Sequence, residues 1–168
     1  CCSASTTWEV VTDFPEIASM AIGDITLDPN NHNTVYAGTG DLRYGSFSFG
    51  AAGLLKSTDG GDTWTILGAD VFNPFYGPSA GGFPQYQAIG KVVVDPRDSD
   101  NLIVGTKTGL YLSYDGGANW TGPCRTNPHT TQRQDTTGLI AVASADNLST
   151  RLFAAIGTRG SPTPVQPD

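Results

Sequence analysis

The sequence predicts an all-β protein built from a repeated unit of four short antiparallel strands. The first indication is composition: 21 glycines, 11 prolines and only 15% charged residues are typical of sheets joined by tight turns rather than of helices. The second is an eight-residue motif, Ser-x-Asp-x-Gly-x-x-Trp, which occurs at residues 57–64 and again at 113–120. A degenerate copy, Cys1 to Trp8, opens the chain. The third is that the segments around the two motifs also match each other.

Those matching segments predict the individual strands. In the first unit they are residues 21–29, 33–39, 53–57 and 63–67, and in the second they are residues 88–96, 101–106, 109–113 and 119–121. A third copy begins with residues 138–143 and 151–157, and residues 7–11 fit the outer strand of an earlier unit. Four such strands, rich in β-branched and aromatic residues and bounded by Gly, Pro, Asn and Asp, predict a β-propeller blade.

This pattern divides the chain into blades. We expect the last strand of a preceding blade at 1–12, blades at 13–68 and 69–121, a partial blade at 122–160 and a Pro-rich tail at 161–168. A closed propeller needs about four to eight blades. The chain is therefore expected to be an incomplete propeller, a fragment completed by the remainder of the propeller or by partner chains. A self-contained open domain is the alternative.

The eight-residue motif itself has a structural explanation. The Asp carboxylate can accept backbone N–H groups of its own turn, glycine supplies positive φ, and the tryptophan starts the next strand as a buried anchor. We therefore interpret its members as structural rather than catalytic. They are Ser57, Asp59, Gly61, Trp64, Ser113, Asp115, Gly117 and Trp120.

Charge and cysteine content restrict the function classes. A net charge of −7 with three lysines argues against nucleic acid as a partner, because phosphate binding needs clustered Lys and Arg. No apolar run reaches the roughly 18 residues of a membrane span.

His32 and His129 stand alone, so neither a metal site nor a cofactor is predicted. Cys124 could pair with Cys1 or Cys2, or the three thiols could be free or link chains. Two glycosylation triplets, at 119–121 and 147–149, point weakly to secretion.

Alternating strand directions place three long loops on one face of the predicted propeller. The loops are residues 40–52, 68–87 and 122–137, and loops of this length often carry function. Their aromatic and charged residues suit stacking against sugar rings or holding an extended polymer or peptide. The alternative is that the aromatic residues pack the loops onto the propeller. The ligand-binding candidates are Arg43, Tyr44, Phe47, Phe49, Phe75, Tyr76 and Tyr86, and the carboxylates beside them are Asp41 and Asp70.

The motif at 57–64, with the preceding runs at 28–29, 34–40 and 53–57, resembles the Asp-box, or BNR, repeat of β-propellers. The chain is similar over nearly its whole length to sortilin-type domains, photosystem II assembly-factor propellers, family 74 xyloglucanases and sialidases. The resemblance implies a fold but no single activity. The sialidase arginine triad, Tyr nucleophile and Arg-Ile-Pro motif cannot be placed here. Family 74 enzymes imply two Asp residues on different loops as acid and base. Asp41 and Asp70 are the candidates, although they do not match that family's catalytic motifs.

Two functions follow as hypotheses. The first is a secreted or cell-surface module, not catalytic in this fragment, that binds a protein or glycan or serves in an extracellular assembly. The alternative is part of a glycoside hydrolase of the family 74 type that acts on β-glucan. Two carboxylates facing each other across a cleft on the long-loop face would favour the enzyme, and a flat or protein-covered face would favour the module.

Overall fold

The computed structural model describes residues 7, 9–11, 21–41, 50–72, 75–78, 84–124, 135–146 and 149–158, with only the backbone at 75–78, 84–86, 135–146 and 152–158. This part of the chain is all-β, as predicted, and every paired strand is antiparallel to its neighbour. Among these residues there is no helix long and apolar enough to cross a membrane.

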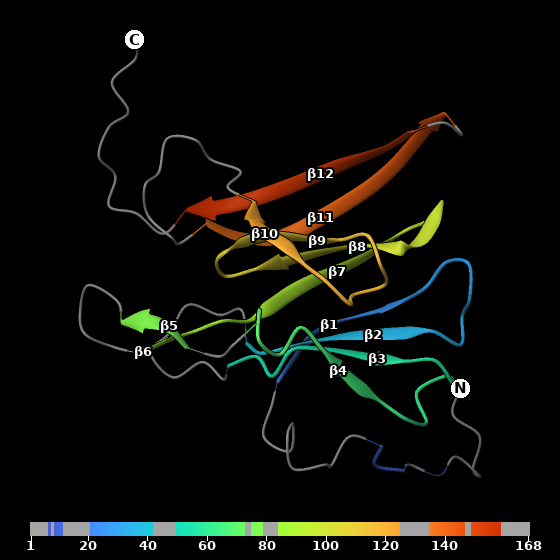
Figure 1. The fold of residues 1–168 in the computed structure, drawn as a ribbon, viewed down its shortest axis with the longest axis horizontal. Helices are drawn as coiled ribbons and strands as arrows, with labels where there is room; N and C mark the ends of the chain where they lie inside the picture. The colour runs from blue at the N-terminus through green and yellow to red at the C-terminus, as the bar shows by residue number, and fades with distance from the viewer. Residues whose placement is uncertain are drawn as a thin grey trace.

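Two of the sheets have four strands each (Figure 1). The first sheet has the order β1-β2-β3-β4 and the second has the order β10-β9-β8-β7, so each follows the chain from strand to strand. The strands of the first sheet are β1 (Ile22–Leu27), β2 (Val35–Thr39), β3 (Leu54–Ser57) and β4 (Thr65–Leu67), and those of the second are β7 (Ile89–Asp95), β8 (Asp98–Thr106), β9 (Gly109–Ser113) and β10 (Thr121–Cys124).

Two further strand pairs complete the described part. The third sheet pairs β11 (Asp135–Asp146) with β12 (Ser149–Thr158), and a hairpin pairs β5 (Phe75–Pro78) with β6 (Pro84–Tyr86). The eight predicted strands of the two full blades are all present. β10 begins two residues later than expected, and β11 and β12 are longer. Residues 7 and 9–11, expected to form an outer strand, are not in a strand.

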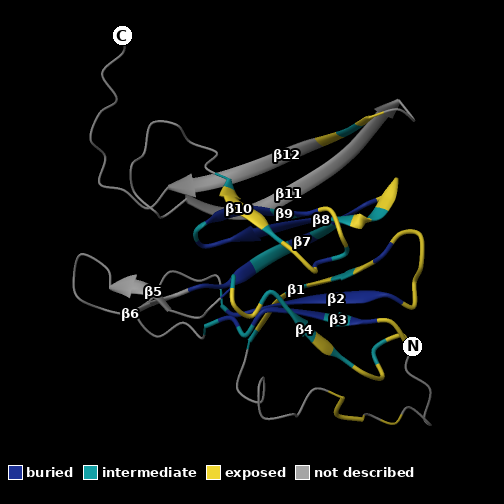
Figure 2. Ribbon diagram, viewed as in Figure 1, coloured by how far each residue is buried: buried dark blue, intermediate teal, exposed yellow. Residues whose placement is uncertain are grey.

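The three sheets stack with their first strands side by side. β1 contacts β7, and β7 in turn contacts β11. The main hydrophobic core lies between the first and second sheets, where Tyr36 and Leu54 of the first meet Val92, Leu102 and Val104 of the second. Figure 2 shows this burial concentrated in β2, β3 and β7–β9. Side-by-side first strands are the arrangement expected of propeller blades.

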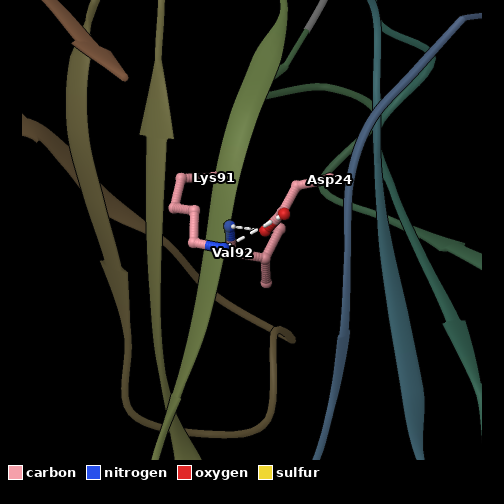
Figure 3. Close-up of polar contacts among 3 residues, drawn as sticks. All are labelled: Asp24, Lys91 and Val92. Carbon is pink, nitrogen blue, oxygen red and sulfur yellow. Dashed lines mark hydrogen bonds and ion pairs between the residues drawn. The ribbon is translucent and has the colours of Figure 1, made fainter. Parts of the chain in front are cut away.

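One carboxylate joins β1 and β7, the first strands of the two full sheets. The Oδ1 of Asp24 on β1 lies 3.1 Å from the Nζ of Lys91, and its Oδ2 accepts the backbone N–H of Val92 at 2.8 Å (Figure 3). β7 is the edge strand of its sheet, so this N–H points away from β8. Asp24 therefore satisfies a backbone donor that no strand partner reaches.

The Asp-Pro turns form a second, repeated link between sheets. Asp28 Oδ1 accepts the Asn30 N–H at 2.8 Å and the Ser99 hydroxyl of the second sheet at 2.9 Å. In the same way, Asp95 Oδ1 accepts a backbone N–H two residues on, at 3.0 Å, and the Thr150 hydroxyl of the third sheet at 2.9 Å. Each of these Asp residues thus closes its own turn and holds the next sheet.

Candidate functional site

The connections between strands divide between two ends of the stack (Figure 1). The turn end carries the short connections, residues 28–34, 58–64, 96–97 and 114–120. The loop end is where β2, β4, β8 and β10 end and where β3, β7, β9 and β11 begin. The strand ends that flank the long loops therefore lie together, as predicted, because antiparallel strands alternate in direction.

The motif at residues 57–64 forms a closed turn at the turn end. Ser57 Oγ accepts the Gly61 N–H at 2.9 Å and donates to Asp59 Oδ1 at 2.7 Å. The Asp59 carboxylate accepts the Thr63 N–H at 2.9 Å and the Thr63 hydroxyl at 2.5 Å. The Thr63 hydroxyl, the Thr63 N–H and the Ser57 hydroxyl together lower the pKa of Asp59 to about 2. The carboxylate is engaged by its own turn.

The motif at residues 113–120 repeats this geometry. Ser113 Oγ accepts the Gly117 N–H at 2.9 Å, and Asp115 accepts both the backbone N–H and the side-chain amide of Asn119, at 2.9 and 2.8 Å. The two hydrogen bonds from Asn119, that of its backbone N–H foremost, lower the pKa of Asp115. Gly117 has φ of 95°, which favours glycine. Both Asp residues lie at the end opposite the long loops, which supports their interpretation as turn-forming groups.

Threonines at the ends of β2 and β8 fix the base of the loop end. Thr39 Oγ1 donates to the Gly53 carbonyl at 2.6 Å and accepts the Ala52 N–H at 2.9 Å. Thr106 Oγ1, at the equivalent position, donates to the Gly109 carbonyl at 2.9 Å. The same clamp thus closes a connection of two residues in the second sheet and a much longer one in the first. A long loop is accommodated without disturbing the sheet beneath it.

Gln87, which is buried, links three connections at the loop end. Its backbone carbonyl accepts the Ala51 N–H at 2.8 Å, and its side-chain amide donates to Thr108 Oγ1 at 2.5 Å. The Thr108 hydroxyl also lies 3.2 Å from the Tyr111 hydroxyl. Sequence reasoning did not identify Gln87. Its place directly before the repeated Ala-Ile-Gly segment was the available signal.

The loop at 68–88 contains structure that the sequence reading missed. The strands β5 and β6 pair there as a hairpin, with Phe75 and Tyr86 as register partners. Before it, the N–H groups of Val71 and Phe72 donate to the Gly68 carbonyl at 3.1 and 2.8 Å, forming a tight turn. This turn places Phe72 in the core, fully buried and edge-on to Tyr111 and Trp120. Phe72 therefore packs its loop onto the sheets, as the alternative interpretation of the loop aromatics expected.

The comparisons with known proteins concern enzymes. No family model matches the chain. A xyloglucanase of Hypocrea jecorina is 28% identical over 98% of this chain and 23% of its own length. A xyloglucanase of a Paenibacillus species is 32% identical over 70% of this chain and 11% of its own length. Xyloglucanase Xgh74A of Acetivibrio thermocellus is 31% identical over 68% of this chain and 13% of its own length. The chain spans less than a quarter of each of these relatives.

Solved structures agree on the fold. The GH74 enzyme of Niastella koreensis matches with a TM-score of 0.53 and 23% identity, over 83% of this chain and 20% of its own. The GH74 xyloglucanase of Xanthomonas campestris matches with a TM-score of 0.51 and 23% identity, over 73% of this chain and 17% of its own. The chain is related to the GH74 β-propellers. The GH74 part of the resemblance is thereby supported, and its sortilin-type and Asp-box parts stay predictions.

The GH74 relationship directs attention to the carboxylates of the loop end. Asp41 is half-buried and follows Gly40, whose N–H donates to the Ala21 carbonyl at 2.7 Å. Asp70 is exposed, within the turn at 68–72. Arg43, Tyr44, Phe47 and Phe49 lie outside the described residues. Phe75, Tyr76 and Tyr86 belong to β5 and β6, where only the backbone is described.

The remaining predicted groups lie elsewhere. Cys124 is half-buried and carries a free thiol, whereas Cys1, Cys2, Trp8 and His129 lie outside the described residues. His32 is exposed in the turn after β1. Within the described ranges, no group of three or more His, Cys, Asp or Glu residues could hold a metal ion. A groove of about 330 Å³ between β1 and β7 lies toward the turn end, where Pro29 and Pro96 line it.

Proposed function

We propose that this chain is part of a glycoside hydrolase of the GH74 type that acts on a β-glucan, with xyloglucan as the first substrate to test. The observation that carries the proposal is the match to a xyloglucanase over 98% of the chain. Sequence similarity of that extent covers the loop end as well as the strands. The remainder of the propeller, in the same polypeptide or in partner chains, would complete the substrate site.

The loop end is where the substrate would bind. Asp41 and Asp70 are the described carboxylates that we propose as acid and base, each on a different long loop. An inverting glycosidase holds its two carboxyl groups about 6.5–9.5 Å apart so that a water fits between them. Either residue could equally be one half of a pair whose other half lies beyond these 168 residues.

The aromatic residues of the same loops would hold the sugar chain. The candidates lie in sequence between β2 and β3 or in β5 and β6, and they are Arg43, Tyr44, Phe47, Phe49, Phe75, Tyr76 and Tyr86. Flat rings bury large apolar areas, which suits stacking on the faces of sugar rings. We also propose that the protein acts outside the cell, where an intact polysaccharide is accessible.

The proposal is tested by incubating the native protein with xyloglucan and measuring hydrolysis as the release of reducing ends. If Asp41 or Asp70 is an acid or base, its replacement by Asn should lower kcat by about 10²–10⁴-fold while the protein still binds the polysaccharide. Asp62→Asn is the matched control, because Asp62 is exposed at the turn end. Binding without any hydrolysis would contradict the proposal and favour the non-catalytic glycan-binding module. Full activity in both variants would exclude these two carboxylates.

A further inference from the structure

Gln87 lies where the two full sheets meet at the loop end, and it is only 3% exposed. Both ends of its side-chain amide are engaged, since Nε2 donates to Thr108 Oγ1 at 2.5 Å and Oε1 accepts the Ala88 N–H at 3.3 Å. Its backbone carbonyl accepts the Ala51 N–H at 2.8 Å. A buried amide bonded in this way holds the segments around it in one arrangement, because any other would leave polar groups unpaired.

One side of this junction holds the backbone that leads to Asp41. Gly40, the residue before Asp41, is so closely packed that a Cβ there would lie 2.8 Å from both the Cα and the Cβ of Ala88 and 3.1 Å from the Ala51 nitrogen. Its φ of 97° also favours glycine. Ala51 and Ala88, both bonded to Gln87, therefore determine where the chain enters Asp41.

The other side of the junction holds the turn at 68–72, which carries Asp70. The Thr108 hydroxyl, which accepts the glutamine amide, lies 3.2 Å from the Tyr111 hydroxyl. The Tyr111 ring is edge-on to that of Phe72, with centroids 5.2 Å apart. Phe72 is fully buried and is the last residue of the turn. The contacts from the glutamine amide through Thr108 and Tyr111 thus reach the turn two residues from Asp70.

We propose that Gln87 is a positioning residue, which fixes the segments that carry Asp41 and Asp70 relative to each other. This inference deepens the proposed function and rests on it for the roles of the two carboxylates as acid and base. A glycosidase holds its two carboxyl groups at a separation that its reaction requires. Misplacement by about 1 Å can lower the rate by about 10²-fold. Gln87 acts in this role without touching the substrate.

A buried glutamine could instead serve stability alone, and Ser99 offers a comparison that separates the two roles. The Ser99 hydroxyl also joins the two full sheets, but at the turn end, where it donates to Asp28 Oδ1 at 2.9 Å. Loss of either link should weaken the contact between the sheets. Only loss of the Gln87 link should change the placement of the loop-end carboxylates.

Steady-state kinetics of the native polypeptide on xyloglucan tests the proposal, at a temperature where circular dichroism shows each variant to be folded. Gln87→Leu should lower kcat by about 10–100-fold. Its KM should stay within about threefold, because substrate binding is kept while the reacting groups are misplaced. Ser99→Ala should keep the kcat of the unsubstituted protein. An unchanged kcat in Gln87→Leu, or an equal loss in Ser99→Ala, would overturn the proposal.

A second pair of variants replaces the partner of the amide, in case Gln87→Leu does not fold. Thr108→Val keeps the shape of the side chain and removes the hydroxyl that accepts from Gln87, so it should lower kcat in the same way. Thr108→Ser keeps the hydroxyl, and its kcat should stay within about threefold of the unsubstituted value. Equal kcat values for the two variants would contradict the role of this hydrogen bond.

A third measurement needs no substrate and so separates this inference from the proposed function. Nitroxide labels are attached at Asp41→Cys and Asp70→Cys, with the other cysteines replaced by Ser, and electron paramagnetic resonance gives the distribution of distances between them. Adding Gln87→Leu should broaden this distribution, and adding Ser99→Ala should not. An unchanged distribution in Gln87→Leu would overturn the proposal even in an active protein. Broadening in a protein that hydrolyses no β-glucan would support the link between the two segments and contradict only the proposed function.

Discussion

The first and second sheets are two copies of one repeat that differ in what covers them. They share strand order, the threonine clamp at the loop end and the hydrogen-bonded turn with its Asp carboxylate. Ile89 of the second sheet is fully buried, whereas its counterpart Ile22 in the first is 45% exposed. The repeat therefore determines local structure, and the neighbouring sheet determines burial. In repeat architectures, stability is divided in the same way between each unit and its interfaces.

The tryptophans of the two turns show the same difference in detail. Trp64 donates its Nε1–H to the Gly61 carbonyl at 2.8 Å. Trp120 instead packs edge-on against Phe72, with ring centroids 5.0 Å apart, and its buried Nε1 has no hydrogen-bond partner in the structure. A Cβ on Gly68 would lie 2.8 Å from that nitrogen. The turn at 68–72 thus closes over Trp120, and no equivalent segment in the described residues closes over Trp64.

The largest effect is expected from removing the ring that covers Trp120. Phe72→Ala leaves a cavity between Tyr111 and Trp120, and it should lower the free energy of unfolding by about 3–5 kcal/mol. Urea denaturation followed by circular dichroism measures this change. Tyr114→Ala is the control and should stay within about 0.5 kcal/mol of the unsubstituted chain, because Tyr114 is exposed. A small effect of Phe72→Ala would show that the loop does not contribute to the core.

A matched pair of isoleucines measures the difference between the sheets directly. Ile89→Ala should destabilise the 168-residue chain by about 2–5 kcal/mol, because its side chain packs in the core against Gly38. Ile22→Ala removes the same atoms from the equivalent position, half-exposed here, and should have well under half that effect. Equal losses in urea denaturation would contradict the difference in burial. In a longer polypeptide with a sheet docked on the first one, the two values should converge.

The strands and turns were predictable because their signals are local. Two Asp-Pro pairs, two Ser-x-Asp-x-Gly-x-x-Trp motifs and alternating apolar residues place eight strands without any tertiary information. The order of the strands then follows from short connections. The structure confirms that level of the prediction. It also confirms that the long loops leave and re-enter the sheets at one end, because that follows from strand direction alone.

The loop end was less predictable because its contacts join segments far apart in the sequence. Nothing in the composition of residues 68–88 indicates that Phe72 is buried. Its burial follows from the close approach of Gly68 to Trp120, which the sequence does not show. The role of Gln87 likewise depends on Thr108 and Ala51 being near it. The candidate carboxylates Asp41 and Asp70 remain predictions, which the activity measurements test.

A smaller effect on stability is expected at the Asp24 link between β1 and β7. Asp24→Ala leaves the Val92 N–H without its acceptor and should lower the free energy of unfolding by about 1–3 kcal/mol. Lys91→Met keeps that hydrogen bond and removes only the ion pair, so its effect should be below about 1 kcal/mol. Salt should reduce the effect of Lys91→Met more than that of Asp24→Ala. Identical losses in urea denaturation would mean that the ion pair, and not the backbone contact, joins the sheets.

The smallest effect sharpens the comparison between the two turns, because it concerns charge alone. The pKa of Asp59 is lowered from 3.8 to about 2 by the Thr63 hydroxyl and N–H, and Asn119 lowers that of Asp115 in the same way. A lowered pKa in the folded state stabilises the fold above pH 3.8, and this contribution is lost as the pH falls through about 2.

Titration of the Asp carboxyl carbons by NMR measures each group separately. Thr63→Ala should raise the pKa of Asp59 and leave that of Asp115 unchanged. Asn119→Ala should raise the pKa of Asp115 and leave that of Asp59 unchanged. The rise should be greater for Thr63→Ala, because the Thr63 hydroxyl is the largest cause of the Asp59 shift, whereas the backbone N–H that leads at Asp115 survives the loss of the Asn119 side chain. Parallel shifts of both carboxyl groups in either variant would show that the protein's overall charge sets these values. Separate shifts would show that each turn fixes its own carboxylate, whichever neighbour covers its sheet.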